Sequence, residues 1–248
     1  MPMPAPTTAR RAGPDRYVLG VDGCRAGWAV IRLNHYDKVV TGFIAGTFGE
    51  ALGAGAAMTI VDMPIGLADR GPRACEAMAR AALKPLRHSS VFSSPRRPML
   101  AFADYAGANA WGKLPGNGGK GLSKQAWMIA PKIREIDAAI SSADQARLGE
   151  GHPEVAFARL NGGAPCRHPK RTSEGQTERR ELLRRSGIEN AEEIFESLRA
   201  TAGRGVGRDD VYDACALALT AKARLEGDAL RLSDDARDAR GLVMEIWG

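Results

Sequence analysis

The order of the first predicted elements constrains the fold more than any other feature of this sequence. Three short β-rich runs, Y-V-L-G-V-D-G, W-A-V-I-R-L-N and K-V-V-T-G-F-I-A, are separated by turn-like breaks, the second around 35–37, and they predict an antiparallel series. A helix over 47–57 follows, with a threonine at its start and three glycines that weaken it. The continuous apolar run M-T-I-V-D is then typical of a strand buried on both faces. A β-β-β-α-β start predicts an α/β fold.

The chain after residue 62 is mainly helical in pattern. R-A-C-E-A-M-A-R-A-A-L predicts a helix, and so does 123–140, where Ser123 is a suitable N-cap. G-E-G-H-P-E predicts a short extended segment before a helix start, 164–177 predicts a loop, and helices are expected at 178–186, at 192–198 and from near Asp209 onward. We therefore expect one domain over 17–248 with a helical insertion after the fourth strand, at about 68–145.

Composition narrows the class of protein. A chain of 248 residues with 44% hydrophobic residues can bury a sizeable core, and its four cysteines are far apart and lack a C-x-x-C pair, which argues against a disulfide framework or a zinc site. No apolar run reaches membrane-spanning length, and residues 1–16 have the composition of a disordered tail rather than of a secretion signal. These features predict a cytoplasmic protein without membrane contact. The formal net charge of +6 permits a polyanionic partner without requiring one.

Acidic residues follow two of the predicted strands and recur in the last helix. Asp22 closes V-L-G-V-D, and Asp62 follows M-T-I-V. Parallel pairing of the first and fourth strands would place these carboxylates side by side, while Asp210 and Asp213, three residues apart, share one face of the last helix. Carboxylates are ligands that Mg²⁺ or Mn²⁺ accepts, and two ions about 3.5–4 Å apart catalyse phosphodiester hydrolysis. The pattern predicts these four aspartates as metal ligands.

Each aspartate also has a structural explanation. Asp62 suits an Asx turn before a proline, Asp22 suits a turn before a glycine, and Asp209 or Asp210 suits the N-cap or first turn of a helix. Asp213 is harder to explain in this way, because it lies a full turn inside a helix among alanines and leucines, where an acid usually has a partner. Taken together, the aspartates favour a shared site.

Several motifs in one order resemble a known family. V-L-G-V-D-G-C-R-A-G-W, I-V-D-M-P-I-G-L, S-S-V-F-S-S-P-R-R, S-K-Q-A-W with K-I-R-E-I-D, G-E-G-H-P-E-V-A-F and R-D-D-V-Y-D-A-C-A-L-A-L-T-A resemble the predicted RNase H-like nucleases carried as domain of unknown function 429. The similarity runs from about residue 17 to 223. The D-D-V-Y-D-A-C-A-L-A-L segment is also similar to the closing helix of RuvC-type junction resolvases.

The resemblance implies a ribonuclease-H-like fold, with a mixed five-stranded sheet in the order 3-2-1-4-5 flanked by helices. It implies that Asp22 and Asp62 are metal ligands and that Asp213 and Asp210 complete the site. Glu150, His152 and Glu154 belong to the H-P-E pattern of the family. On this basis Glu154 or Glu150 is a candidate catalytic residue that approaches the metals. His152 is a candidate to orient a water molecule or to contact a phosphate. A solvated glutamate and a packed histidine are equally good explanations.

Two basic or glycine-rich stretches are candidate nucleic-acid contacts. The loop P-G-N-G-G-K-G fails the Walker A pattern at two positions, so a flexible loop is the simpler interpretation. The functional interpretation is that Lys120 and Lys124 contact the backbone of a nucleic acid. S-S-V-F-S-S-P-R-R-P either walls the active-site cleft and offers Arg96 and Arg97 to a phosphate backbone, or forms a rigid loop. Arg25, which follows the first acid, is a further candidate for phosphate contact. The alternative is that Arg25 is a solvated residue of the turn.

Two functions remain open from the sequence. The first is a metal-dependent nuclease that hydrolyses RNA, DNA or a structured substrate with two Mg²⁺ or Mn²⁺ ions. The second is a non-catalytic module of the same fold that binds nucleic acid or another ligand. An ATPase of the actin or sugar-kinase type fits poorly, because those proteins need two lobes with glycine-rich phosphate loops. The sequence leaves open whether a homodimer forms.

Overall fold

The strands form one mixed sheet and one separate hairpin. The computed structural model describes residues 17–34, 36 and 39–248, so the predicted tail over 1–16 and most of the break around 35–37 lie outside the described residues. The strands are β1 (Tyr17–Cys24), β2 (Gly27–Asn34), β3 (Val40–Ala45), β4 (Met58–Val61), β5 (Leu148–Glu150), β6 (Arg231–Arg237) and β7 (Val243–Trp247).

The five-stranded sheet has the order β3-β2-β1-β4-β5, which confirms the predicted mixed α/β sheet. β2 pairs antiparallel with β1 and β3, whereas β4 runs parallel to β1 and β5 parallel to β4. In the parallel register Val21 lies opposite Val61, and the backbone N–H of Asp62 donates to the carbonyl of Val21. The carboxyl ends of β1, β4 and β5 therefore meet at one edge of the sheet.

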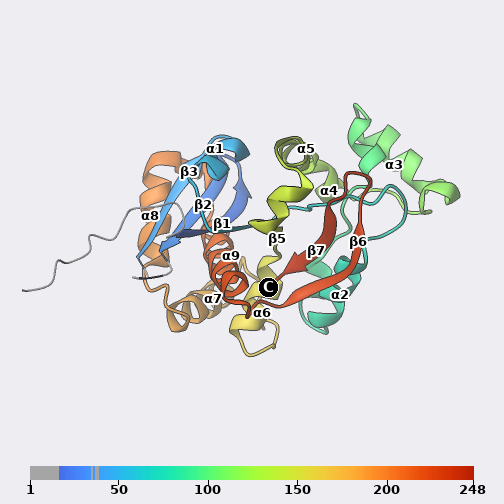
Figure 1. The fold of residues 1–248 in the computed structure, drawn as a ribbon. Helices are drawn as coiled ribbons and strands as arrows, with labels where there is room; N and C mark the ends of the chain where they lie inside the picture. Colours follow the sequence, from blue (N-terminus) through green and yellow to red (C-terminus); the bar gives the residue numbers. More distant parts are fainter. Residues whose placement is uncertain (1–16, 35, 37–38) are drawn as a thin grey trace, which may run out of the picture.

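Nine α-helices and several short 3₁₀ turns, among them η2 (His88–Ser90) and η3 (Arg97–Ala101), lie in the described chain (Figure 1). The helices are α1 (Phe48–Gly53), α2 (Ala74–Ala82), α3 (Tyr105–Lys113), α4 (Lys124–Met128), α5 (Ala130–Ala139), α6 (Pro153–Leu160), α7 (Ser173–Arg185), α8 (Ala191–Ala202) and α9 (Arg208–Glu226). Among the described helices, none combines the length and apolarity of a membrane span.

Strand alternation sends neighbouring side chains to opposite faces of the sheet. Val18 packs with the helices α6 to α9 in one core cluster, whereas Leu19 and Val21 pack with α1 and α5 in another. Because successive residues of a strand point to opposite faces, Asp22 shares the α9 face with Val18 and Gly20. Because α5 packs on the face that carries Leu19 and Val21, it is part of the core that covers the sheet. It does so although it is the last α-helix of the long helical segment between β4 and β5.

Several predicted boundaries were wrong; for example, the helix expected over 47–57 ends at Gly53, and the one expected over 192–198 continues to Ala202. The single helix expected over 123–140 is two helices, α4 and α5, because Pro131 near the start of α5 has no N–H to continue the first helix. Ser123 does cap α4, accepting from the backbone N–H of Ala126 at 3.0 Å. The loop expected over 164–177 ends earlier, since Thr172 caps α7 by accepting from Gly175 N at 3.1 Å.

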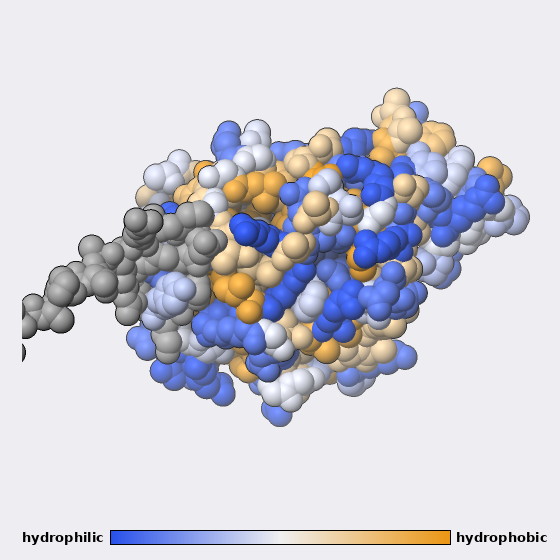
Figure 2. All heavy atoms as spheres, in the orientation of Figure 1, coloured by the Kyte–Doolittle hydropathy of each residue, from blue (hydrophilic) through white to orange (hydrophobic). Residues whose placement is uncertain are grey.

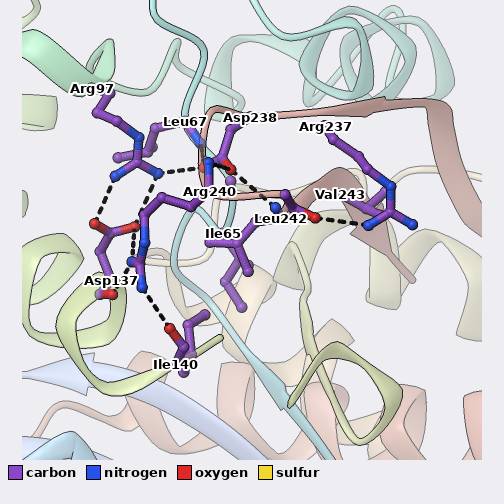
Figure 3. A network of polar contacts seen from close by, with 12 residues as sticks. Ile65, Leu67, Arg97, Asp137, Ile140, Arg237, Asp238, Arg240, Leu242 and Val243 are labelled. Atoms are coloured by element: carbon purple, nitrogen blue, oxygen red, sulfur yellow. Dashed lines mark hydrogen bonds and ion pairs between the residues drawn. The ribbon is translucent and has the colours of Figure 1, made fainter. Parts of the chain in front are cut away.

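The C-terminal hairpin β6–β7 joins the helical segment to the sheet. β7 reaches β5 through a parallel bridge between Gly151 and Trp247. Arg97, at the start of η3, donates to Asp137 of α5 and to Asp238, which follows β6 (Figure 3). Arg97 therefore connects three segments that are distant in sequence.

The face of the molecule drawn in Figure 2 is mainly hydrophilic, with apolar residues in small groups.

Candidate functional site

Asp22 and Asp62 lie side by side at the carboxyl edge of the sheet. Asp22 is the sixth residue of β1, and Asp62 follows β4 directly, one position beyond the paired residues Val21 and Val61. In open α/β sheets the crevice outside the carboxyl ends of parallel strands is the usual place for a ligand. The parallel pairing that the sequence predicted thus brings these two carboxylates together.

Gly20 brings the third aspartate to the same place. A Cβ at Gly20 would lie 1.9 Å from the carbonyl oxygen of Ala214 and 2.2 Å from the backbone nitrogen of Ala218, so glycine is required for α9 to pack directly on β1. Asp213 immediately precedes Ala214 and is 1% exposed. Because Asp22 lies two residues after Gly20 on the same face, this close approach sets Asp213 beside Asp22.

A pocket of about 430 Å³ opens over these carboxylates. One wall is formed by residues 89–92 of the S-S-V-F-S-S stretch, and Gln125 and Ile129 form part of another. The titratable side chains that line it are Asp22, Asp62, Glu76, Glu150, His152, Glu154, Lys170, Arg171, Asp209, Asp210 and Asp213. All four predicted metal ligands therefore share one pocket.

The aspartates differ in their hydrogen bonds. Asp22 Oδ1 accepts from the backbone N–H of Gly23 at 2.8 Å, but both residues lie inside β1 and pair with β2, so the turn explanation for Asp22 was wrong. Asp210 Oδ2 accepts from Gly207 N at 2.8 Å and so supports the start of α9, as the capping explanation proposed. Asp213 Oδ1 is buried and has no hydrogen-bond partner among the described residues. Asp213 therefore has an unused acceptor at the pocket.

Lys170 is a site residue that the sequence did not indicate. Its Nζ lies 2.5 Å from Asp213 Oδ2 and 3.7 Å from Asp209 Oδ2. Burial lowers the pKa of Lys170, but the charges of Asp213 and Asp22 outweigh it and raise that pKa above its ordinary value. Lys170 stands in the loop before α7, where no periodicity or motif marks a functional residue. Its ammonium group offsets part of the negative charge of the pocket.

The carboxylates hold their protons unusually tightly. Burial, followed by the charge of Asp62, raises the pKa of Asp22 well above its ordinary value. Burial and the charge of Asp213 raise the pKa of Asp62 to about 7, and burial raises that of Asp210 to about 6. Burial also raises the pKa of Asp213, against the opposing effect of Lys170. Crowded acids with raised pKa values are the arrangement that a bound cation stabilises.

Glu150 and Glu154 are paired with arginines. Glu150 receives two hydrogen bonds from the Arg73 guanidinium, at 2.8 and 2.5 Å. Alternation along β5 turns its side chain away from the α9 face, on which Asp22 lies. Glu154 lies in α6 rather than on a strand, and its Oε1 accepts from Arg179 at 2.5 Å while Oε2 has no partner. Glu154 thus keeps one unpartnered oxygen, whereas Glu150 serves to hold Arg73.

His152 lies at the N-cap position of α6 and lines the pocket. Burial lowers its pKa to about 4, so the imidazole is neutral at pH 7. Within the part of the chain that the structure describes, its Nδ1 has no hydrogen-bond partner. A neutral ring with a free nitrogen suits the hydrogen bonding that the H-P-E resemblance implied for His152 better than ion pairing with a phosphate.

The predicted basic contacts lie outside this pocket. Arg25 is exposed in the β1–β2 turn, and Lys120 and Lys124 are exposed near α4. Arg96 is 8% exposed and donates to the carbonyls of Gly112 and Lys120. Arg97 is held by two aspartates as described above. Contact of these five residues with nucleic acid therefore stays a prediction, and the bonds of Arg97 give it a structural role.

The donor set fits a hard divalent cation. Carboxylate oxygens from β1, from the end of β4 and from α9 face one pocket, and Asp213 Oδ1 has no protein partner. Within residues 17–34, 36 and 39–248, no three His, Cys, Asp or Glu side chains already stand in ligand geometry. Asp22, Asp62 and Asp213 have the donor chemistry that Mg²⁺ or Mn²⁺ needs, and metal binding at this pocket stays a prediction.

A comparison with protein families identifies the chain. A family model described as "Protein of unknown function (DUF429)" matches residues 20–238, a stretch that includes all four aspartates of the pocket. Neither a curated protein nor a solved structure gives a match. The match covers most of the chain, from β1 to the end of β6. The protein belongs to the DUF429 family.

Proposed function

We propose that the protein is a metal-dependent nuclease of RNase H-like type, which hydrolyses a phosphodiester bond of nucleic acid. The sheet order β3-β2-β1-β4-β5 is the order that the resemblance to RNase H-like nucleases implies. The observation that carries the proposal is the convergence of Asp22, Asp62 and Asp213 on one pocket, with Asp213 Oδ1 buried and unpartnered. A deeply buried carboxylate oxygen without a partner is costly unless a ligand satisfies it.

The residues of the pocket have distinct roles in this proposal. Asp22, Asp62 and Asp213 would hold Mg²⁺ or Mn²⁺, which supplies the polarisation of the phosphodiester and of the attacking water. Asp210 keeps the first turn of α9 in place through its bond to Gly207 and adds negative charge behind Asp213. His152, neutral at pH 7, offers a hydrogen bond to water at the pocket wall, and Arg179 fixes the orientation of Glu154.

The test compares Asp213→Asn with Asp69→Asn. Asp69 is an exposed aspartate outside the pocket, so its variant controls for the loss of one charge. The purified proteins are incubated with labelled single-stranded and duplex RNA and DNA and with a four-way junction, each with Mn²⁺, Mg²⁺ or EDTA. We expect cleavage that needs the metal, is kept by Asp69→Asn and falls by at least about 10²-fold in Asp213→Asn. Equal cleavage by both variants would refute the proposal.

A non-catalytic binding module is the second candidate, and the Lys170 contact favours it. The ammonium of Lys170 already satisfies Asp213 Oδ2 and lies near Asp209, so part of the site is neutralised without a metal. Such a module binds nucleic acid in EDTA with an affinity that falls with salt and is unchanged in Asp22→Asn. Fluorescence anisotropy with the same substrate panel distinguishes the two candidates, since the nuclease needs Asp22 and the module does not.

A further inference from the structure

A second cavity, of about 400 Å³, lies next to the acidic pocket and differs from it in charge. The two cavities share Glu76 and Phe92 in their linings, so they adjoin along the S-S-V-F-S-S stretch. The second cavity is lined by the basic residues Arg73, Arg80, Arg96 and Lys120, together with Ser93, Ser94 and part of the glycine-rich loop. Glu76 is the carboxylate in this lining.

Of these four cations, Arg96 and Lys120 have no carboxylate partner among the described residues, whereas Arg73 and Arg80 do. Arg73 is paired with Glu150 at 2.5 Å, and Glu76 lies 3.3 Å from Arg73 and 3.9 Å from Arg80. The guanidinium of Arg96 donates through Nη2 to two backbone carbonyls, and its Nε is buried without a partner. The guanidinium also lies over the ring of Trp111, 5.9 Å from its centroid, but it is 8% exposed and faces no carboxylate among the described residues. Proteins rarely keep a buried charge without an anionic partner.

The glycine-rich loop is built around this guanidinium. A Cβ at Gly112 would lie 2.4 Å from Arg96 Nη2, and a Cβ at Gly118 would lie 2.9 Å from Nη1. Gly118 also has a φ of +104°, which a side chain rarely adopts. The glycines of P-G-N-G-G-K-G and of α3 therefore allow the backbone to close over Arg96, and the exposed Lys120 stands at the same cavity.

We propose that the cavity beside Arg96 binds a phosphate group, and that this phosphate belongs to the nucleic-acid strand whose scissile bond lies in the acidic pocket. The second half of this inference rests on the proposed nuclease function, whereas the first half does not. Arg96 and Lys120 supply the positive charge, and the hydroxyl of Ser93 lies in the same lining, whereas the hydroxyl of Ser94 donates to Glu76 Oε1 at 2.7 Å. The half-buried ring of Phe92, shared by both cavities, is placed to stack against a base between the two phosphates.

The experiment uses a pair of variants that differ only in charge. Ser93 is exposed and lines the cavity, so Ser93→Asp places a carboxylate there, and Ser93→Asn has the same size without the charge. Inorganic phosphate binding is measured by isothermal titration calorimetry in EDTA. We expect Ser93→Asp to bind phosphate about tenfold more weakly than Ser93→Asn. Lys120→Gln should weaken phosphate binding about threefold, and Lys84→Gln, at an exposed lysine elsewhere, should leave it unchanged.

A second arm identifies the source of the phosphate. The same Ser93 substitutions are made in an Asp213→Asn background, and binding of a short single-stranded oligonucleotide is followed by fluorescence anisotropy. Weaker binding of both probes to Ser93→Asp supports the whole proposal. Loss of phosphate binding with unchanged oligonucleotide binding would overturn the nucleic-acid assignment and indicate a free phosphate compound. Equal phosphate binding by the two Ser93 variants would overturn the site and leave Arg96 as a support for the glycine loop. No arm depends on cleavage, so failure of the nuclease proposal is seen separately.

Discussion

Lys170 holds the position that a cation would need next to Asp213. Replacement by methionine keeps an unbranched side chain of nearly the same length but removes the ammonium 2.5 Å from Asp213 Oδ2. We expect Lys170→Met to bind Mn²⁺ about tenfold more tightly than the wild type, because the metal no longer displaces a paired ammonium group. The metal-free variant should also unfold at a lower temperature, since Asp213 is left as a buried unpaired charge. Electron paramagnetic resonance of free Mn²⁺ gives the affinity.

Arg171→Gln is the matched control for Lys170→Met. Arg171 lines the same pocket, is exposed and loses the same charge, but it makes no ion pair with Asp213. A gain in Mn²⁺ affinity as large in Arg171→Gln would mean that only the net charge of the pocket matters. Weaker Mn²⁺ binding by Lys170→Met would mean that Lys170 supports the metal site instead of competing for it.

Asp62 makes the stability of the metal-free protein depend on pH. Its pKa is about 7 in the folded chain against an ordinary value of 3.8, so between these pH values the folded state binds a proton that the unfolded state has lost. The contribution of Asp62 to the free energy of unfolding therefore falls as the pH rises from about 4 to 7. We expect Asp62→Asn to be more stable than the wild type by about 1–3 kcal/mol at pH 8 in EDTA, and the difference to shrink toward pH 5.

Urea unfolding at pH 5 and pH 8 measures this difference for Asp62→Asn, with Asp69→Asn as the exposed control. The control should follow the wild type at both pH values, because Asp69 is exposed and lies outside the pocket. If Asp62→Asn is the less stable protein at pH 8, the carboxylate stabilises the metal-free fold, and repulsion within the pocket is not its main interaction.

At the scale of elements, the site depends on the contact of α9 with β1. We expect Gly20→Ala to lower the free energy of unfolding by about 3 kcal/mol, because the added Cβ meets backbone atoms of Ala214 and Ala218 that only a shift of α9 can relieve. The same shift should weaken Mn²⁺ binding, since it moves Asp213 away from Asp22. Gly53→Ala, where the added Cβ meets nothing within 4 Å, is the control. Unchanged Mn²⁺ affinity in Gly20→Ala would show that the site tolerates movement of α9.

The elements that carry the aspartates were predictable, because their signals are local. Buried apolar runs that end in an acid marked β1 and β4, and parallel pairing then fixed the neighbourhood of Asp22 and Asp62. The strand β6 has no such signal, because R-L-S-D-D-A-R is polar, and the hairpin is stabilised by contact with α2 and β5. The apolar run V-M-E-I-W of β7 does carry a strand signal, although no strand was predicted there. Lys170 and the partner of Glu154, Arg179, reach the site from distant segments. Such tertiary pairs leave no trace in sequence periodicity.

At the scale of the whole molecule, Arg97 connects the helical segment, α5 and the C-terminal hairpin (Figure 3). The tryptophans report on these parts separately, because Trp28 is buried in the sheet core while Trp111 and Trp127 pack around the small core of α3 and α4. We expect the wild type to unfold in one transition seen alike by circular dichroism and tryptophan fluorescence. In Arg97→Met we expect the fluorescence transition to precede the circular dichroism transition. The free energy of unfolding measured by fluorescence should be about 2–3 kcal/mol lower than in the wild type, because the buried Asp238 loses its charged partner.

Arg237→Met separates the loss of this connection from the loss of any arginine in the hairpin. Arg237 lies at the end of β6, close to Asp238, but its guanidinium is bonded to the carbonyl of Gly241 within the same hairpin. We therefore expect Arg237→Met to keep coincident transitions. If Arg97→Met also unfolds in one transition, the α3–α4 region is joined to the sheet through the packing of α5, and the ion pairs of Arg97 only orient it.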